Sequence, residues 1–165
     1  MGEQKTTASS VNRAKTYQLV LFPLNNGATN VYYVLVLSYI ATFGSKVLAL
    51  SMLFASVMVT GMRLFDAVTD PIIGALMDRT NGRFGKFRPF MVIGNLIMAA
   101  SILVLYCLTP LIPASAMGLR YAAFVALYAV WVIGYTFQTS CTRSGQTVLT
   151  NDPKQRPLFL SLIHI

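Results

Sequence analysis

RLFDAVTDPIIGALMDRTNGRFGKFRP, residues 63–89, is the stretch that decides how this chain is organised. Its first half places Arg63, Asp66 and Asp70 inside an otherwise apolar run. A charge at mid-membrane depth costs about 3 kcal/mol, and such charges usually mark ion pathways or relays. Its second half is a basic segment in which glycines permit tight turning. The stretch therefore indicates a membrane helix that binds something charged and leads into a hinge.

The composition of the whole chain supports a membrane protein. Hydrophobic residues make up 55% of the 165 residues and charged residues 11%, whereas soluble domains have about 25% charged residues. The mean hydropathy is +0.61. The net charge of +8 does not indicate a nucleic-acid binder, because the basic residues lie between apolar runs instead of along one face. We expect an all-α integral membrane protein embedded in the lipid bilayer.

Four apolar segments are long enough to cross a bilayer, since a span needs about 20 residues. After a polar lead over 1–18, we expect spans at about 19–42, 47–77, 90–112 and 121–150. A short turn at Gly44–Lys46 is expected between the first two spans, and a loop ending at Arg120 before the fourth. Pro89 suits the first turn of the third span, because its missing N–H has no helical partner there. A fifth helix is expected to begin near Leu158.

Charge asymmetry predicts the orientation. Nine of the thirteen Lys and Arg residues fall in segments on the side of the N-terminus, and only Lys46 and Arg120 fall on the other side. Because basic residues stay on the cytoplasmic side, we expect a multi-pass protein of the cell membrane with a cytoplasmic N-terminus. The last six residues, LSLIHI, match a translated sequencing-adapter end, so we expect 160–165 to be non-native.

Asp66 and Asp70 are the residues with the clearest chemical signal. They are four apart, so they share one helix face with about 6 Å between them, and Arg63 joins the same stripe. Two buried carboxylates repel each other, and a proton or small cation between them relieves that repulsion. The alternative is an Arg63–Asp66 pair that only orients helices. Pro71 frees the carbonyl of Ala67 for a cation or another helix.

The segment after this helix contains both glycines and charges. Asp78 lies beside Arg79 and Arg83, and Lys86 follows, so these residues could form a charge latch that gates the cytoplasmic side; a plain positive-inside loop is the alternative. Gly61 and Gly74 are expected to allow close helix packing. Cys107 and Cys141 lack metal-ligand spacing, and we expect no structural metal and no cofactor.

The segment from Gly74 to Arg83 resembles the loop between helices 2 and 3 of the major facilitator superfamily. The full 63–89 stretch resembles more specifically the glycoside–pentoside–hexuronide:cation symporter family, of which the melibiose carrier is typical, and YTFQTS…LTNDPKQRP resembles its helix 4 and the following loop. The resemblance implies twelve helices, a central sugar site and alternating access driven by Na⁺, Li⁺ or H⁺. It implies that 19–159 is part of an N-terminal six-helix half, and that the remainder of the protein is missing here.

The resemblance also assigns roles by position. It implies cation binding by residues of the second and fourth spans: Asp66, Thr69, Asp70, Tyr135 and Thr136. It places three residues in the sugar site where the melibiose carrier has two aspartates and a tryptophan: Asn25, Thr139 and Arg143. These differences make the site more positive, and a guanidinium grips carboxylates bidentately. The hypothesis that follows is an anionic sugar, a uronide; alternatively, Arg143 pairs with Asp66 or Asp70.

Two other classes of function remain as alternatives. One is a membrane-embedded enzyme that uses Asp66 and Asp70 for acid–base work, although the apolar segments contain no nucleophile–base pair. The other is an accessory membrane protein that does not transport. We favour a sugar:cation symporter over an enzyme, and we expect this 165-residue chain to be inactive on its own.

Overall fold

The computed structural model describes residues 12–80, 85–150 and 152–164, and these residues are almost entirely helical, with no strand among them. The long helices are α1 (Thr16–Lys46), α2 (Met52–Arg79), α3 (Arg88–Leu103) and α4 (Met117–Leu149), followed by a shorter α5 (Gln155–His164). α3 continues through a π-helical turn, η1 (Val104–Leu108), and a 3-10 turn, η2 (Thr109–Leu111); η3 (Ala114–Ala116) precedes α4. The all-α prediction is confirmed.

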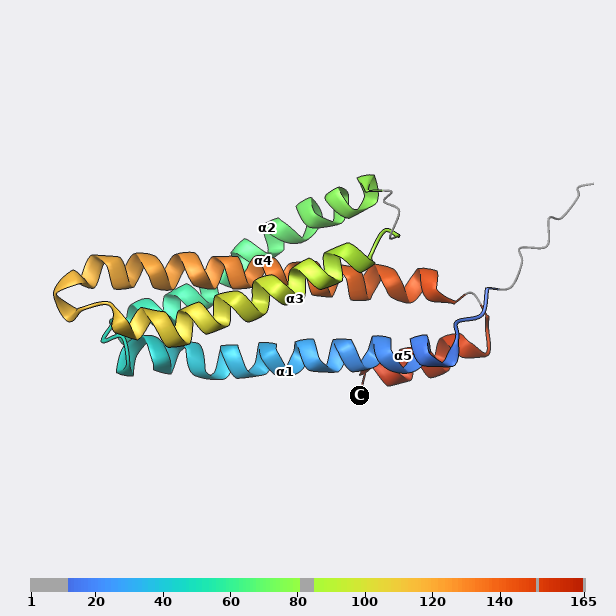
Figure 1. Ribbon diagram of the computed structural model, residues 1–165, viewed down its shortest axis with the longest axis horizontal. Coiled ribbons are helices and arrows are strands. Elements are labelled where there is room, and N and C mark those ends of the chain that lie inside the picture. Colours follow the sequence, from blue (N-terminus) through green and yellow to red (C-terminus); the bar gives the residue numbers. More distant parts are fainter. Residues whose placement is uncertain (1–11, 81–84, 151, 165) are drawn as a thin grey trace, which may run out of the picture.

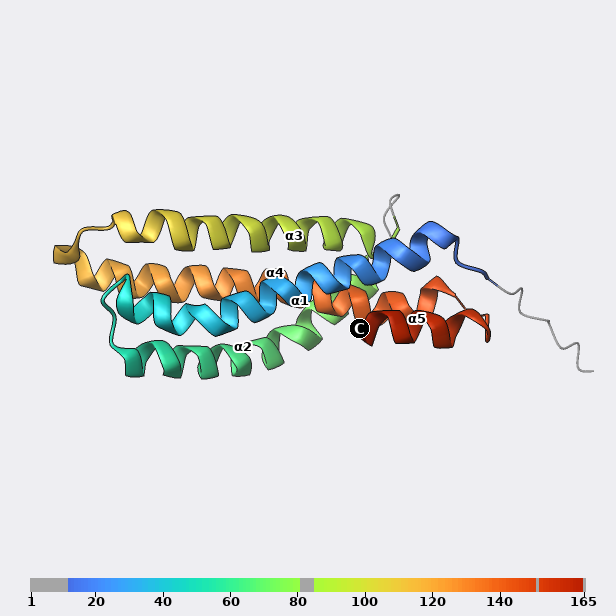
Figure 2. The ribbon, with the colours of Figure 1, turned by 90° about the horizontal axis from the view of Figure 1, so that it is seen from below.

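The four long helices run side by side, and α5 turns back along the first half of α1 (Figures 1 and 2). α2, α3 and α4, with their flanking turns, are each long and apolar enough to cross a membrane. α1 is not in that set, although its 31 residues are long enough, because Asn25, Asn26 and the polar residues beside them dilute its apolar character. The first span therefore stays a prediction.

α3 and α4 form the most extensive helix pair, and two glycines bring them together. A Cβ on Gly134 would lie 2.9 Å from side-chain atoms of Ile97 and Met98, and 3.0 Å from the carbonyl oxygen of Gly94. A Cβ on Gly94 would meet the Gly134 carbonyl at 3.0 Å. Small residues allow this close approach of backbones in membrane helices.

The same reasoning was expected to apply to Gly61 and Gly74. Among the described residues a Cβ on either glycine would meet nothing within 4 Å, so for these two positions close packing stays a prediction. Spacing along one helix cannot tell which face a neighbouring helix covers, and in α2 these two positions lie on faces that the described residues leave open.

The core lies between α4 and the other helices. Phe124, Tyr128 and Trp131 of α4 are almost fully buried, and they pack against Ile40 of α1 and Met62 of α2. Because lipid is as apolar as these side chains, van der Waals packing between them holds the helices together. α4 is therefore the central helix. Later residues on the same face of α4 are also surrounded by the other helices.

The connections at the end of the bundle around Leu48 differ from the sequence prediction. α1 continues through Lys46, so the predicted turn at Gly44–Lys46 is wrong; the turn occupies 47–51, where Leu48 and Leu50 are buried. α4 begins at Met117, so the prediction that Arg120 lies in a loop is also wrong. Arg120 is buried and donates to the carbonyls of Leu48 and Ile112, tying both turns together.

The opposite end contains residues 12–15 and the start of α5. Arg13 forms an ion pair with Asp152 at 2.8 Å. The backbone of Ala14 both donates to and accepts from the Gln155 side chain. Pro89 lies in the first turn of α3, as predicted. α5 starts at Gln155, three residues before the expected Leu158, because Asp152 accepts hydrogen bonds from the backbone of its first turn.

Candidate functional site

Asp66 and Thr136 join α2 to α4 inside the bundle. The Thr136 hydroxyl donates to the Asp66 carboxylate at 2.7 Å, and Thr136 is fully buried. Asp66 is on the α2 face that turns to α4, because Met62, one turn earlier, packs into the core. A hydrogen bond to a carboxylate is about twice as strong as a neutral one, so this contact fixes the orientation of Asp66.

Thr69 lies beside the same pair. Its hydroxyl donates to the backbone carbonyl of Asp66 at 3.1 Å and is 3.4 Å from the Thr136 hydroxyl. The structure thus brings together a carboxylate and two hydroxyls that the sequence placed in different spans. Oxygen ligands of this kind suit hard cations. The described residues contain no group of three or more His, Cys, Asp or Glu that could hold a metal ion.

Asp70 lies one turn beyond Asp66 and faces the last third of α4. Its Oδ2 forms an ion pair with Arg143 Nη1 at 3.1 Å, and the Arg143 side chain is 71% exposed, whereas that of Asp70 is 30% exposed. Its Oδ1 is buried and has no hydrogen-bond partner among the described residues. A buried carboxylate oxygen without a partner is costly.

Pro71 follows directly and lies inside α2. A proline removes one backbone hydrogen bond and bends a helix. In Figure 1 the second half of α2 takes a different direction from its first half. Asp70 therefore lies directly before the proline and Asp66 one turn earlier, so both carboxylates are next to the bend.

Arg63 does not pair with Asp66 in the described structure. Its guanidinium lies over the ring of Tyr33 of α1, 4.8 Å from the centroid, in a cation–π contact. Tyr33 stacks in turn on Tyr135 with a centroid distance of 4.5 Å. Arg63, Asp66 and Tyr135, together with the buried rings of Tyr128 and Trp131, line a cavity of about 10 Å³. This volume is close to that of a single water-sized sphere.

Asn25 lies in a polar network that the sequence did not predict. Its amide nitrogen donates to Gln138 at 3.1 Å, and its amide oxygen accepts from Asn95 at 3.3 Å. Gln138 is fully buried and also donates to the Met91 carbonyl. The network joins α1, α3 and α4. Asn95, the one notable polar residue of the third span, was the only sequence signal for this network. Nothing in the sequence predicts that Asn95 contacts Asn25.

Thr139 lies one turn after Tyr135 on the same face of α4. The Thr139 hydroxyl bonds back to the carbonyls of Tyr135 and Thr136 at 3.2 Å, so it is held within its own helix. Of the three residues expected at the sugar site, Arg143 is one turn from Thr139, whereas Asn25 lies across the bundle in the amide network.

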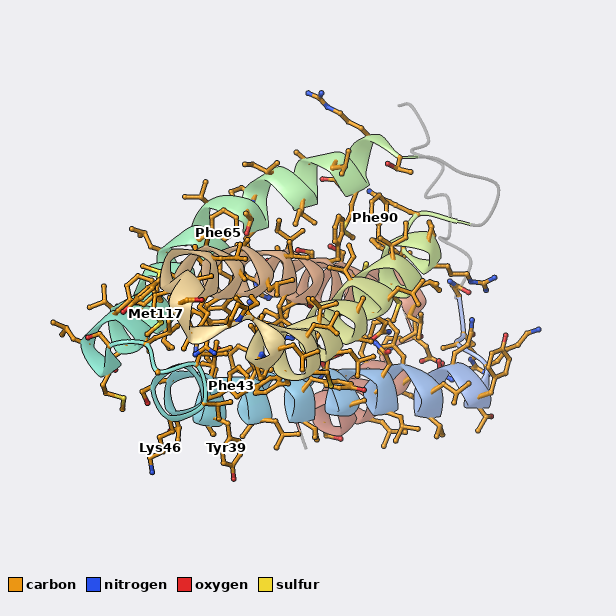
Figure 3. All side chains as sticks on the ribbon, turned by 60° about the vertical axis from the view of Figure 1, so that its left-hand side comes forward. Tyr39, Phe43, Lys46, Phe65, Phe90 and Met117 are labelled. Atoms are coloured by element: carbon orange, nitrogen blue, oxygen red, sulfur yellow. The ribbon has the colours of Figure 1, made fainter. Side chains whose placement is uncertain are left out.

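The predicted gating residues lie at the end of α2. Lys86 pairs with Asp78 at 2.6 Å, and Arg79 is the last residue of α2; Arg83 lies outside the described residues. Phe90, in the first turn of α3, lies below the last turns of α2 in Figure 3 and packs with Ile73 and Met77. An ion pair and an apolar contact therefore hold the bent half of α2 against α3.

Comparisons with known proteins place the chain among membrane transporters. The family model described as MFS/sugar transport protein matches residues 22–162. The chain is 30% identical to the inner membrane symporter YicJ of Escherichia coli, covering 82% of the chain and 28% of that protein. It is 39% identical to the putative glycoside/cation symporter YagG of Escherichia coli, covering 71% and 25%. It is 28% identical to a glucuronide carrier protein homolog of Escherichia coli, covering 84% and 30%.

The matched part is a fraction of each relative, since the chain spans between 25% and 30% of the length of these three proteins. No solved structure matches the chain significantly.

Proposed function

The chain belongs to the MFS/sugar transport protein family, and from this premise we propose that the complete protein carries a sugar or glycoside across the cell membrane together with a cation. Its relatives are described as symporters and carriers, so the alternative of a membrane-embedded enzyme is set aside. Transport would proceed by alternating access around a site at mid-membrane depth. The N-terminus would be cytoplasmic, as the excess of basic residues at that end favours.

The observation that carries the proposal is the oxygen cluster between α2 and α4. Asp66 and Asp70 supply negative charge one helical turn apart, and the hydroxyls of Thr69 and Thr136 lie beside Asp66. The unpartnered Asp70 Oδ1 faces a penalty that a bound cation removes. Na⁺, Li⁺ or H⁺ would be the coupling ion, and Tyr135, stacked on Tyr33, would form an aromatic wall of the site.

Arg143 gives the cluster a means of coupling. In the absence of the cation its guanidinium neutralises Asp70 across 3.1 Å. A cation that binds Asp70 would compete with Arg143 and release it. The freed guanidinium would then grip the carboxylate of an anionic sugar bidentately. Substrate binding would therefore depend on prior cation binding, and the substrate would be a uronide, the class of compound in the name of one relative.

The residues around the bend in α2 would transmit cation binding at Asp70 to the cytoplasmic end of the helix. Pro71 bends α2 next to Asp70, and the Asp78–Lys86 ion pair and the Phe90 contact hold its far end to α3. Breaking these contacts would open the cytoplasmic side, with Arg79 and Arg83 as further candidates for the same gate. Thr139 and Asn25 would contribute to the solute side, Asn25 through its amide network.

The test is uptake of labelled glycosides and glucuronides by the complete protein in vesicles with an imposed Na⁺, Li⁺ or H⁺ gradient. One of these gradients is expected to drive accumulation, and Asp70→Asn is expected to abolish it. Asp152→Asn, which changes a carboxylate outside the bundle, is the matched control. Gradient-driven accumulation that survives Asp70→Asn would refute the coupling role, and equal uptake of neutral and acidic sugars would refute the uronide specificity.

A further inference from the structure

A cavity separate from the Asp66–Asp70 cluster lies at the N-terminal end of the bundle. It has a volume of about 630 Å³ and is formed by the start of α1, the start of α3 and the last turns of α4. A volume of this size is in the range that holds a small organic ligand. Of the residues with a proposed role in cation binding, solute binding or gating, only Lys86 of the gate is among the described residues that line this cavity.

The cavity has a basic rim and apolar walls. Its lining includes Arg13, Lys86 and Arg88, and no carboxylate among the described lining residues. Leu21, Met91 and Val148 are among the residues that form its walls. This combination suits a molecule with an anionic head and an apolar body, because the charged and apolar surfaces are segregated.

The charge at the rim is only partly neutralised. Lys86 is paired with Asp78, and Arg13 with Asp152 through its Nε. A guanidinium has further N–H donors on its two terminal nitrogens, so Arg13 can bind a second anion while it keeps Asp152. Arg88 takes part in no ion pair within residues 12–80, 85–150 and 152–164. The rim therefore has cationic donors available for an anion.

The apolar side of the cavity continues along an exposed surface of α1. Leu21, which lines the cavity, is 58% exposed, and Leu24, one turn further into the predicted membrane segment, is 66% exposed. Tyr17 at the mouth is also exposed, and tyrosine is enriched at the membrane–water interface. An acyl chain could thus leave the cavity along α1 and stay in hydrocarbon, whereas a soluble anion would leave these walls unfilled.

We infer that this cavity binds an anionic phospholipid of the inner leaflet, with its phosphate on Arg13 and Arg88 and an acyl chain along Leu21. Basic pockets between membrane helices on the cytoplasmic side bind lipid headgroups of this kind. The inference rests on the proposed orientation, and it is independent of sugar transport. The lipid would hold α1 and α3 together at the end where the gate opens, so binding would favour the closed gate.

The test uses the complete protein in nanodiscs of mixed phosphatidylglycerol and phosphatidylethanolamine, followed by native mass spectrometry to count retained lipids. Retention of phosphatidylglycerol over phosphatidylethanolamine is expected. Arg88→Gln and Arg13→Gln are each expected to lower that retention about fivefold, the equivalent of about 1 kcal/mol per basic residue near a charged surface. Arg88→Lys, which keeps the charge, is expected to retain most of it.

Lys46→Gln is the matched control, because Lys46 lies at the other end of α1 (Figure 3) and its loss is expected to leave retention unchanged. Asp70→Asn should also retain the lipid, which separates this inference from the transport proposal. Equal retention of both lipids, or retention unaffected by Arg88→Gln, would overturn it. Complete displacement of the lipid by inorganic phosphate would also overturn the inference, because it would show a simple anion site. So would the retention of no lipid, the result expected if another segment of the protein fills the cavity.

Discussion

Arg143 is the residue whose replacement separates the two halves of the proposed coupling scheme. Its guanidinium holds Asp70 at 3.1 Å and is 71% exposed. In the proposed scheme a cation displaces this guanidinium from Asp70, whereas a uronide recruits it. Arg143→Gln is therefore expected to have opposite effects on the affinities for the two ligands, strengthening cation binding and weakening binding of the acidic sugar.

The sizes of the two effects follow from the geometry. A solvent-exposed ion pair contributes about 0.2–1 kcal/mol, so removing the competitor should tighten cation binding by about 1.4- to 5-fold. A hydrogen bond to a charged group contributes about 1.5–3 kcal/mol, so losing the guanidinium should weaken glucuronide binding by about 10- to 150-fold. The second effect exceeds the first, because the bound carboxylate would be enclosed in the complete protein.

Isothermal titration calorimetry on the purified complete protein measures both affinities, with the cation alone and then with the sugar at saturating cation. Arg143→Lys is the control, since it keeps the competing charge and loses the planar fork. This variant should leave the cation affinity near that of the unaltered protein and still weaken glucuronide binding. Unchanged glucuronide affinity in Arg143→Gln, or a cation affinity that falls, would refute the exchange scheme.

Three further predictions test other parts of the structure. Gly134→Ala should lower the free energy of unfolding by about 1–3 kcal/mol, because its Cβ would lie 3.0 Å from the Gly94 carbonyl. Gly118→Ala in the same helix is the control, because a Cβ there meets nothing within 4 Å of the described residues. Equal thermal stability of the two variants would contradict this packing. Arg120→Gln should cost about 1–3 kcal/mol in the same assay, since it deprives two carbonyls of their donor. Thr69→Val should alter which cation drives uptake, whereas Thr60→Val, on an exposed face of α2, should not.

The sequence predicted the helices well because membrane spans need long apolar runs. It also predicted the start of α3 from Pro89 and the shared face of Asp66 and Asp70, since both depend only on local geometry. The turn after α1 could not be predicted correctly, because burial of Leu48 and Leu50 overrode the turn-like residues Gly44 and Ser45.

Contacts between helices were the part that the sequence could not supply. Gln138 is one of many polar residues near the end of α4, and its spacing does not reveal that it meets Asn25 and the Met91 carbonyl. An Arg63–Asp66 pair was the alternative interpretation of this stripe, but the ring of Tyr33, from a different helix, lies under the Arg63 guanidinium. Such pairings depend on helix rotation and tilt, which are set by packing between helices and not by periodicity within one.

The central claim is that Asp66 and Asp70 bind the coupling cation, and direct cation binding to the purified complete protein tests it. Titration calorimetry with Na⁺, Li⁺ and protons is expected to give a single binding site for the coupling ion. That site should disappear in the double variant Asp66→Asn/Asp70→Asn and persist in Asp152→Asn. A cation isotherm that is unchanged in the double variant would contradict the account.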